Sequence, residues 1–181
     1  AVIGRGTDLL VSSDLSNQRG IPLSYNKVLQ VKPGFTVDNP PDLRSVRTSS
    51  SASAGVLQQG ASAKLTTALT PSTTLVSLTA FRALDNEFFA DSDITELELL
   101  SAHSLERQHQ WSEEVTISHR RPRSSWIAGA FFFREADHQT IRVDQPPSGV
   151  QVVLDPRVDA TSVAGFGQAT FDLTPRLSGT I

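Results

Sequence analysis

A run of oxygen-bearing side chains in residues 85–93 is the most concentrated candidate for metal chemistry. Its members are Asp85, Asn86, Glu87, Asp91 and Asp93. Calcium prefers oxygen ligands of this kind. The run lacks the regularly spaced ligand loop and its glycine, so the pattern favours a solvated acidic loop over a calcium site. We therefore predict no metal-binding residues.

The other residue types that support catalysis form no working pattern. The histidines are scattered, without the close spacing of a zinc pair on a helix. They are His103, His109, His119 and His138. The chain has no cysteine, no Gly-x-Ser-x-Gly elbow and no glycine-rich phosphate loop that opens a helix. The sequence thus predicts no catalytic residue, no cofactor and no enzyme activity, and it assigns no ligand-binding residue.

Charge and hydropathy remove further classes of protein. Sixteen basic and nineteen acidic residues leave a formal charge of −3, whereas a nucleic-acid binder usually shows a concentrated basic face. The basic cluster Arg120, Arg121 and Arg123 falls in a predicted turn. No apolar run approaches the roughly 20 residues of a spanning helix, although membrane β-strands need only about 9–11. The 181 residues include no methionine, so we interpret the chain as a processed or internal fragment.

The elements that would position these side chains are best defined in residues 108–135. This stretch predicts two antiparallel strands joined by a turn at residues 120–124. In the first strand every even position from Gln108 to Ser118 is polar, while Trp111, Val115 and Ile117 occupy odd positions. A period of two indicates a strand with one wet face. The second strand, residues 125–133, is apolar and small, and its faces cannot be assigned by parity.

The remaining chain predicts further strands separated by unequal connections. Residues 1–55 are expected to form a long loop-rich segment. Strands are expected at residues 56–69, 73–84 and 161–172, with the start of another after residue 176. In the second of these, Val76, Leu78 and Ala80 alternate with Ser77 and Thr79. Residues 86–107 and 136–160 are expected to be long connections, the former with a helical turn or two.

The order of the connections predicts the architecture. They run long, short, long, short, long, short, and each short turn contains a proline. In an up-and-down meander, alternate connections lie at the same end of the sheet. We therefore expect an all-β antiparallel meander of about five strands plus the start of a sixth, with the long loops at one end. Short turns at one end and long loops at the other are typical of outer-membrane barrels.

Three stretches resemble the TonB-dependent receptors of the Gram-negative outer membrane. They are LVSLTAFRALDNEFFA from Leu75, QWSEEVTIS followed by WIAGAFFF, and AGFGQATFDLTPRLSGTI at the end. The resemblance covers residues 56–181, which it identifies as part of a transmembrane β-barrel. It implies a parent barrel of about 22 strands with a plugged lumen. Residues 1–55 are then expected on the extracellular side.

The resemblance implies a function in active uptake of a scarce ligand, such as a ferric siderophore, another metal chelate or a carbohydrate. The expected partners are outer-membrane lipid and the transported ligand, and no nucleic acid. Contact with TonB is expected only through the plug region, which these residues do not include. Trp126 would suit the periplasmic aromatic girdle. The run Phe131, Phe132 and Phe133 is expected to face lipid or pack in the barrel wall.

One residue departs from the family pattern. By parity Glu113 would face lipid, where a charge costs up to a few kcal/mol near the midplane. We therefore expect Glu113 to lie outside the hydrocarbon zone.

Two other readings remain open from the sequence. A soluble β-sandwich that acts as a binding module would use the same alternation to face a protein core. It would show no consistent long and short ends and would fold without detergent. A β-rich hydrolase would use loop residues such as His138 and Asp85. An open sheet cut from a barrel, by contrast, is expected to aggregate in water.

Overall fold

The computed structural model describes residues 6–21, 47–93, 95–174 and 176–181. These residues form strands and one short 3-10 helix, η1, and no α-helix. The elements are β1 (Thr7–Gly20), β2 (Ser53–Thr70), β3 (Thr73–Asp91), β4 (Ser101–Arg121), β5 (Ser124–Gln145), η1 (Pro146–Ser148), β6 (Val150–Leu154), β7 (Arg157–Thr174) and β8 (Leu177–Thr180). Within the described ranges, no helix has the length and apolar character needed to cross a membrane.

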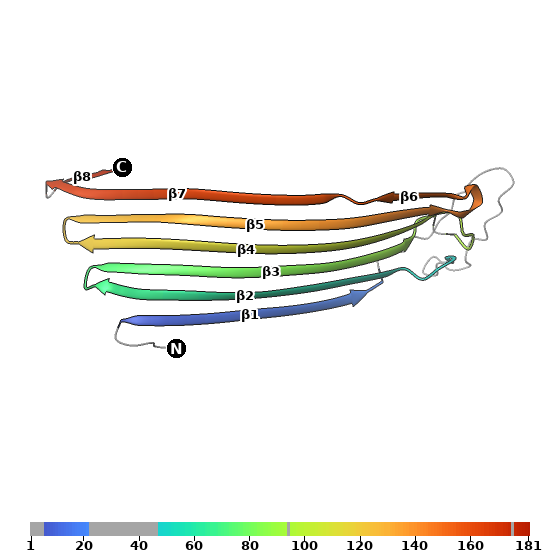
Figure 1. Ribbon diagram of the computed structural model, residues 1–181, viewed down its shortest axis with the longest axis horizontal. Coiled ribbons are helices and arrows are strands. Elements are labelled where there is room, and N and C mark those ends of the chain that lie inside the picture. The colour runs from blue at the N-terminus through green and yellow to red at the C-terminus, as the bar shows by residue number, and fades with distance from the viewer. Residues whose placement is uncertain (1–5, 22–46, 94, 175) are drawn as a thin grey trace.

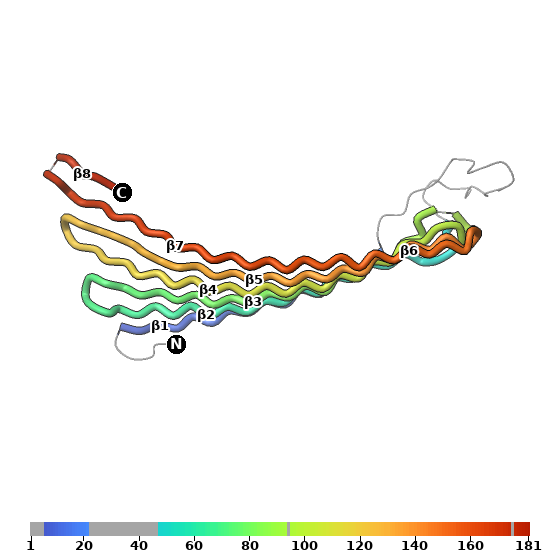
Figure 2. Tube along the Cα trace, turned by 45° about the horizontal axis from the view of Figure 1, so that its top comes forward, coloured from blue at the N-terminus to red at the C-terminus, as the bar shows by residue number. Residues whose placement is uncertain are grey.

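All the strands belong to one antiparallel sheet. Its order is β1-β2-β3-β4-β5-β7-β8, and β6 pairs with the end of β5 that extends beyond β7. The predicted all-β antiparallel meander is therefore confirmed. Figure 2 shows the strands as one curved layer. The described residues contain no second sheet that packs against it, which a β-sandwich within this chain would require.

The ends of the sheet differ as the connection lengths predict. Short turns join β2 to β3, β4 to β5, and β7 to β8, and all three lie at one end, on the left in Figure 1. The opposite end carries residues 92–93 and 95–100 and the η1–β6 hairpin. The end of β1 and the start of β2 also lie toward that end, since Gly20 pairs with Ala54. We call these two ends the short-turn end and the long-connection end.

The strands are longer than predicted, and this corrects two expectations. Within residues 1–55, which were expected to be loop-rich, Thr7–Gly20 forms β1; residues 22–46 lie outside the described part. Strands β3 and β4 reduce the connection expected at 86–107 to residues 92–100, without a helical turn among the residues described there. Strands β5, β6 and β7 occupy most of 136–160. Cross-strand polar pairs such as Asp85 with Arg107 extend the ladder where hydrophobic alternation has ended.

Register assigns the side chains to two faces, because directly paired residues point the same way. We name them the Trp111 face and the Gln110 face. The odd residues of β2, β4 and β7 share the Trp111 face, in agreement with the predicted alternation. Strand β3 is inverted relative to its prediction: Ser77 and Thr79 lie on the Trp111 face, and Val76 and Leu78 on the Gln110 face. The register also settles β5, with Trp126 and Phe132 on the Trp111 face.

The sheet has almost no protein core of its own. In the described residues Ala83 is the one buried hydrophobic side chain, whereas large apolar side chains on β1, β4, β5 and β7 are exposed. The chain exposes 12879 Å², while a compact monomer of this mass exposes about 8,600 Å² by the usual scaling. Exposed large apolar side chains in such number mark an interaction surface.

Candidate functional site

The acidic residues of β3 are paired individually and do not converge on one point. Asp85 lies 3.5 Å from the Arg107 guanidinium, and Glu87 lies 3.3 Å from His103 Nε2. Asn86, on the opposite face, donates a 3.0 Å hydrogen bond to Glu106. Because successive strand residues alternate between faces, these three oxygens cannot surround one ion.

Asp91 and Asp93 build the connection between β3 and β4. The buried Asp93 carboxylate accepts hydrogen bonds from the backbone N–H groups of Thr95, Leu99 and Leu100, at 3.0, 3.2 and 2.8 Å. The Asp91 carboxylate accepts from the N–H and hydroxyl of Ser49, at 2.8 and 2.9 Å. Throughout the described parts of the chain, no three His, Asp or Glu side chains come together as a metal site. The acidic run therefore orders a connection.

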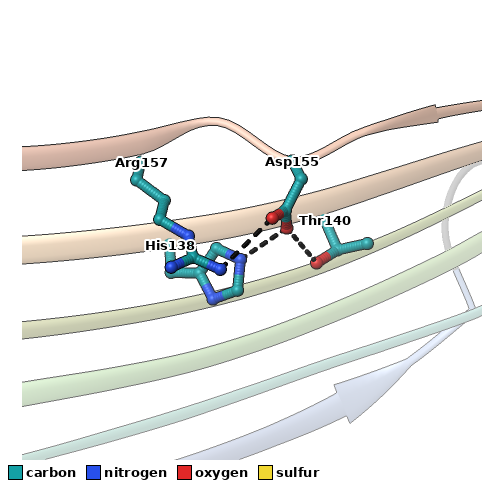
Figure 3. Close-up of polar contacts among 4 residues, drawn as sticks. All are labelled: His138, Thr140, Asp155 and Arg157. Atoms are coloured by element: carbon teal, nitrogen blue, oxygen red, sulfur yellow. Dashed lines mark hydrogen bonds and ion pairs between the residues drawn. The ribbon is translucent and has the colours of Figure 1, made fainter.

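Asp155 is the centre of a polar cluster at the junction between β6 and β7 (Figure 3). Its carboxylate lies 2.5 Å from His138 Nε2 and accepts hydrogen bonds from Thr140 Oγ1 at 3.1 Å and Arg157 at 3.3 Å. The hydrogen bond from His138, followed by that from Thr140, lowers the pKa of Asp155, and the charges of His138 and Arg157 act in the same direction. Next to this cluster, Gln139 N–H donates to Pro156 O at 3.0 Å.

The Asp155 cluster holds the junction between β6 and β7 against β5. Its side chains do not form a nucleophile–base pair of the kind a hydrolase uses. The Thr140 hydroxyl donates to the carboxylate, so it is not activated by His138. Asp85 and His138, the pair proposed for a hydrolase, lie in one row of paired residues with Arg107 between them, about 10 Å apart by strand spacing. Asp85 approaches Arg107 instead.

The remaining histidines pack against aromatic rings on the Trp111 face. His109 stacks on Phe81 with ring centroids 6.2 Å apart, and His119 stacks on Trp126 at 5.8 Å. His103 meets the edge of Phe89 at 6.2 Å. Each of these three imidazole rings thus packs against an aromatic ring of a neighbouring strand.

The Trp111 face carries an apolar band between two aromatic rows. One row, with Trp126, lies near the short turns; the other contains Phe81 and Trp111, and Phe132 packs against Trp111 at 5.4 Å. Along β4, the two rows are about 26 Å apart at about 3.3 Å per residue. Charge begins in the Trp111 row itself, where Arg134 pairs with Trp111. Beyond this row, Asp85, Arg107 and Arg157 lie in one row.

Glu113 is the one acidic or basic side chain between those aromatic rows among the described residues. Glu113 therefore lies within the apolar band of this face, and a position outside the hydrocarbon zone, as expected from the sequence, is not compatible with lipid contact along this band. Ser77 Oγ donates to one carboxylate oxygen at 2.7 Å, and Thr79 Oγ1 donates to the other. Each oxygen thus has a hydroxyl donor from β3. The inverted parity of β3 places these hydroxyls there, and the alternation of β3 alone did not reveal it.

The Gln110 face carries a ladder of amides and carboxylates toward the long-connection end. Gln110 donates to Glu135 at 2.8 Å, and Gln139 donates to Ser104 at 3.2 Å. Asp137 Oδ1 is buried without a hydrogen-bond partner in the described residues. Phe131 and Phe133 stack on this same face, 6.5 Å apart, so only Phe132 of the phenylalanine run lies on the Trp111 face.

Comparison with known proteins found no matching family model, no matching curated protein and no matching solved structure. The functional argument therefore depends on the sheet and its two faces.

Proposed function

We propose that this chain is part of a transmembrane β-barrel of the Gram-negative outer membrane, of the TonB-dependent receptor type, which takes up a scarce ligand. One observation carries the proposal: a single meander with unequal ends leaves an apolar band exposed between two aromatic rows. Barrel strands that cross the outer membrane carry an outward apolar band about 25 Å tall between aromatic girdles.

The dimensions of the Trp111 face support contact with lipid. With strands tilted by about 40°, the distance of about 26 Å along β4 corresponds to about 20 Å along a barrel axis. The aromatic rows then lie near the two interfaces, and the charged row of Asp85, Arg107 and Arg157 lies outside the hydrocarbon. The sheet edges at β1 and β8 would pair with further strands, since an open edge cannot lie in lipid.

The Gln110 face would then line the barrel interior. Its amides and carboxylates, among them Gln110, Glu135 and Gln139, suit a polar lumen. Phe131 and Phe133 give part of this wall an apolar surface. The long-connection end would lie outside the cell, where it would form part of the ligand entrance, and the short turns would face the periplasm.

Uptake by such a receptor is a transport step, and no reaction of the ligand is required. A ferric siderophore is the ligand class that the resemblance implies first. Energy would reach the barrel through a plug and TonB, which are not part of these residues.

The decisive experiment compares a strain deleted for the gene with its parent under iron limitation. The proposal predicts that the intact product fractionates with the outer membrane and that its loss abolishes growth on at least one ferric siderophore, or lowers uptake of another scarce chelate or a carbohydrate. Flanking sequence should encode a signal peptide and plug before residue 1 and further strands after residue 181. A product found in the soluble fraction, folded without detergent, would support a binding module instead.

A further inference from the structure

A polar cavity of about 570 Å³ opens on the Gln110 face at the short-turn end. Two successive rows of paired residues line most of it, contributed by four neighbouring strands and the turn before β3. The inner row is Thr74, Ser118, Ile127 and Gln168, and the outer row is Ser72, Arg120, Ser125 and Thr170. Ser72 joins its row through its carbonyl, which accepts the Arg120 N–H at 2.9 Å.

The side chains in this cavity are mainly hydrogen-bond donors with one positive charge. The lining includes hydroxyls, one amide and the Arg120 guanidinium, together with His119 and Trp126, and it includes no carboxylate. In the described part of the chain, the side chains of Arg120, Ser118 and Ser125 have no hydrogen-bond or ion-pair partner. Among the described residues, the Thr170 hydroxyl has one hydrogen-bond partner, the Thr180 hydroxyl at 3.0 Å. The donors are therefore available to a ligand.

The charge around the cavity differs in sign from that of the whole chain. Residues 119–125 and 170–178 contain four arginines and one acidic residue, Asp172, a net of +3 (four minus one), whereas the chain carries −3. Asp172 lies beyond the outer row and does not line the cavity. Arg121 and Arg123 are also outside the lining. Their field would attract anions to this end of the sheet.

We propose that this cavity binds the oxyanion of a small ligand, either a carboxylate or a phosphate ester. A guanidinium presents two parallel N–H donors that match both groups, and hydroxyl groups can donate to the remaining oxygens. Ile127 and Pro71 supply apolar contact for the rest of the ligand. The volume falls within the range of about 300–1,000 Å³ that is typical of small-molecule sites. This inference rests on the cavity and goes beyond the proposed transport function.

The test uses the intact protein that contains these residues, in detergent micelles, with its β-sheet content checked by circular dichroism. Inorganic phosphate and citrate are titrated separately at constant ionic strength in chloride, and the Arg120 Nε–Hε resonance is followed by NMR. A saturable shift is expected. Arg120→Gln is expected to raise the dissociation constant by about tenfold or more, the effect of losing a charge-assisted hydrogen bond. Arg120→Lys keeps the positive charge but lacks the two parallel N–H donors of the guanidinium. This variant is expected to bind the anion more weakly than the unchanged protein.

Arg123→Gln is the matched control, because it removes the same charge from the turn that follows β4, outside the cavity. It is expected to change the dissociation constant by less than about twofold, since screened surface charges contribute little. Saturation by phosphate alone or by citrate alone would identify the oxyanion that the cavity accepts. The proposal is overturned if neither anion gives a saturable shift, or if Arg123→Gln weakens binding as much as Arg120→Gln. Either result leaves the uptake experiment unaffected.

Discussion

Ser77 Oγ donates a hydrogen bond to Glu113 Oε1 across β3 and β4, with 2.7 Å between the two oxygens. Thr79 supplies the donor for the second carboxylate oxygen. The pairing explains how a carboxylate is accommodated in the apolar band between Trp111 and Trp126. In a lipid-facing band these two hydrogen bonds would lower the cost of the carboxylate, because an unsatisfied polar group in hydrocarbon costs several kcal/mol.

Replacing Ser77 by Ala should lower the free energy of unfolding by about 1.5–3 kcal/mol, the range for hydrogen bonds to charged groups. Ser112→Ala is the control: Ser112 is on the Gln110 face and its side chain has no hydrogen-bond partner in the described residues, so a change within about 0.5 kcal/mol is expected. Urea unfolding in lipid or detergent measures both. In a Glu113→Leu background the Ser77→Ala loss should largely disappear. An equal loss in both backgrounds would show that the two side chains are not coupled.

Gly129 should not tolerate a side chain. A Cβ there would lie 2.5 Å from Phe166 Cζ and 2.8 Å from the Val115 carbonyl oxygen, and backbone cannot move aside cheaply. Gly129→Ala is therefore expected to destabilise the sheet by about 1–3 kcal/mol, the usual cost of overpacking.

Gly165 provides the matched control for this substitution. A Cβ at Gly165 would have its nearest neighbour, the Gly129 carbonyl oxygen, at 3.9 Å, which is an ordinary contact. Gly165→Ala should therefore be neutral or slightly stabilising, since it narrows the unfolded ensemble. Equal unfolding energies for the two variants would contradict the close approach of Phe166 to Gly129.

The junction between β6 and β7 should loosen in acid. Asp155 lies between these strands at the long-connection end, and its pKa in the folded state is lowered from an ordinary 3.8. A lowered folded-state pKa means that the unfolded state binds the proton more readily. The stabilisation is thus fully present above about pH 4 and is lost as the pH falls through the lowered value.

Amide hydrogen exchange of Gln139, whose N–H donates to Pro156 O, reports this loosening. After correction for the intrinsic exchange rate, its protection should fall as the pH is lowered below about 4, while that of Val115 in the middle of β4 should change less. Asp155→Asn cannot titrate and should abolish the difference. Persistence of the pH dependence in that variant would assign it to another carboxylate, such as Asp144.

The sequence predicted the parts of this fold in which one face is uniform. Strand β4 alternates cleanly because every even residue from Gln108 to Ser118 is polar, and the proline-containing turns marked the short-turn end. Strand β3 was assigned the wrong way round because Leu75 and Phe81 are apolar on one face and Val76 and Leu78 on the other. Only pairing with β4 fixes its register.

The missed parts depend on neighbours that are distant in the sequence. Strand β1 contains mainly polar residues on both faces after Val11, and its ladder with β2 defines it. The polar continuations of β3, β4 and β5 are held by cross-strand pairs such as Asp85 with Arg107, which a single-strand pattern does not show. The cavity lined by Arg120 at the short-turn end was not predicted from the sequence for the same reason, since its lining comes from several strands.

The most direct test of lipid contact at the Trp111 face is a spin-label scan of β4 in the intact protein in bilayers. These 181 residues contain no cysteine, so a cysteine introduced in β4 is the one labelling site within them. Labels at Val115 and Ile117 should be accessible to oxygen dissolved in the lipid, whereas labels at Thr116 and Ser118 should be accessible mainly to a water-soluble nickel chelate. Equal accessibility at odd and even positions, or the reverse alternation, would contradict lipid contact at the Trp111 face.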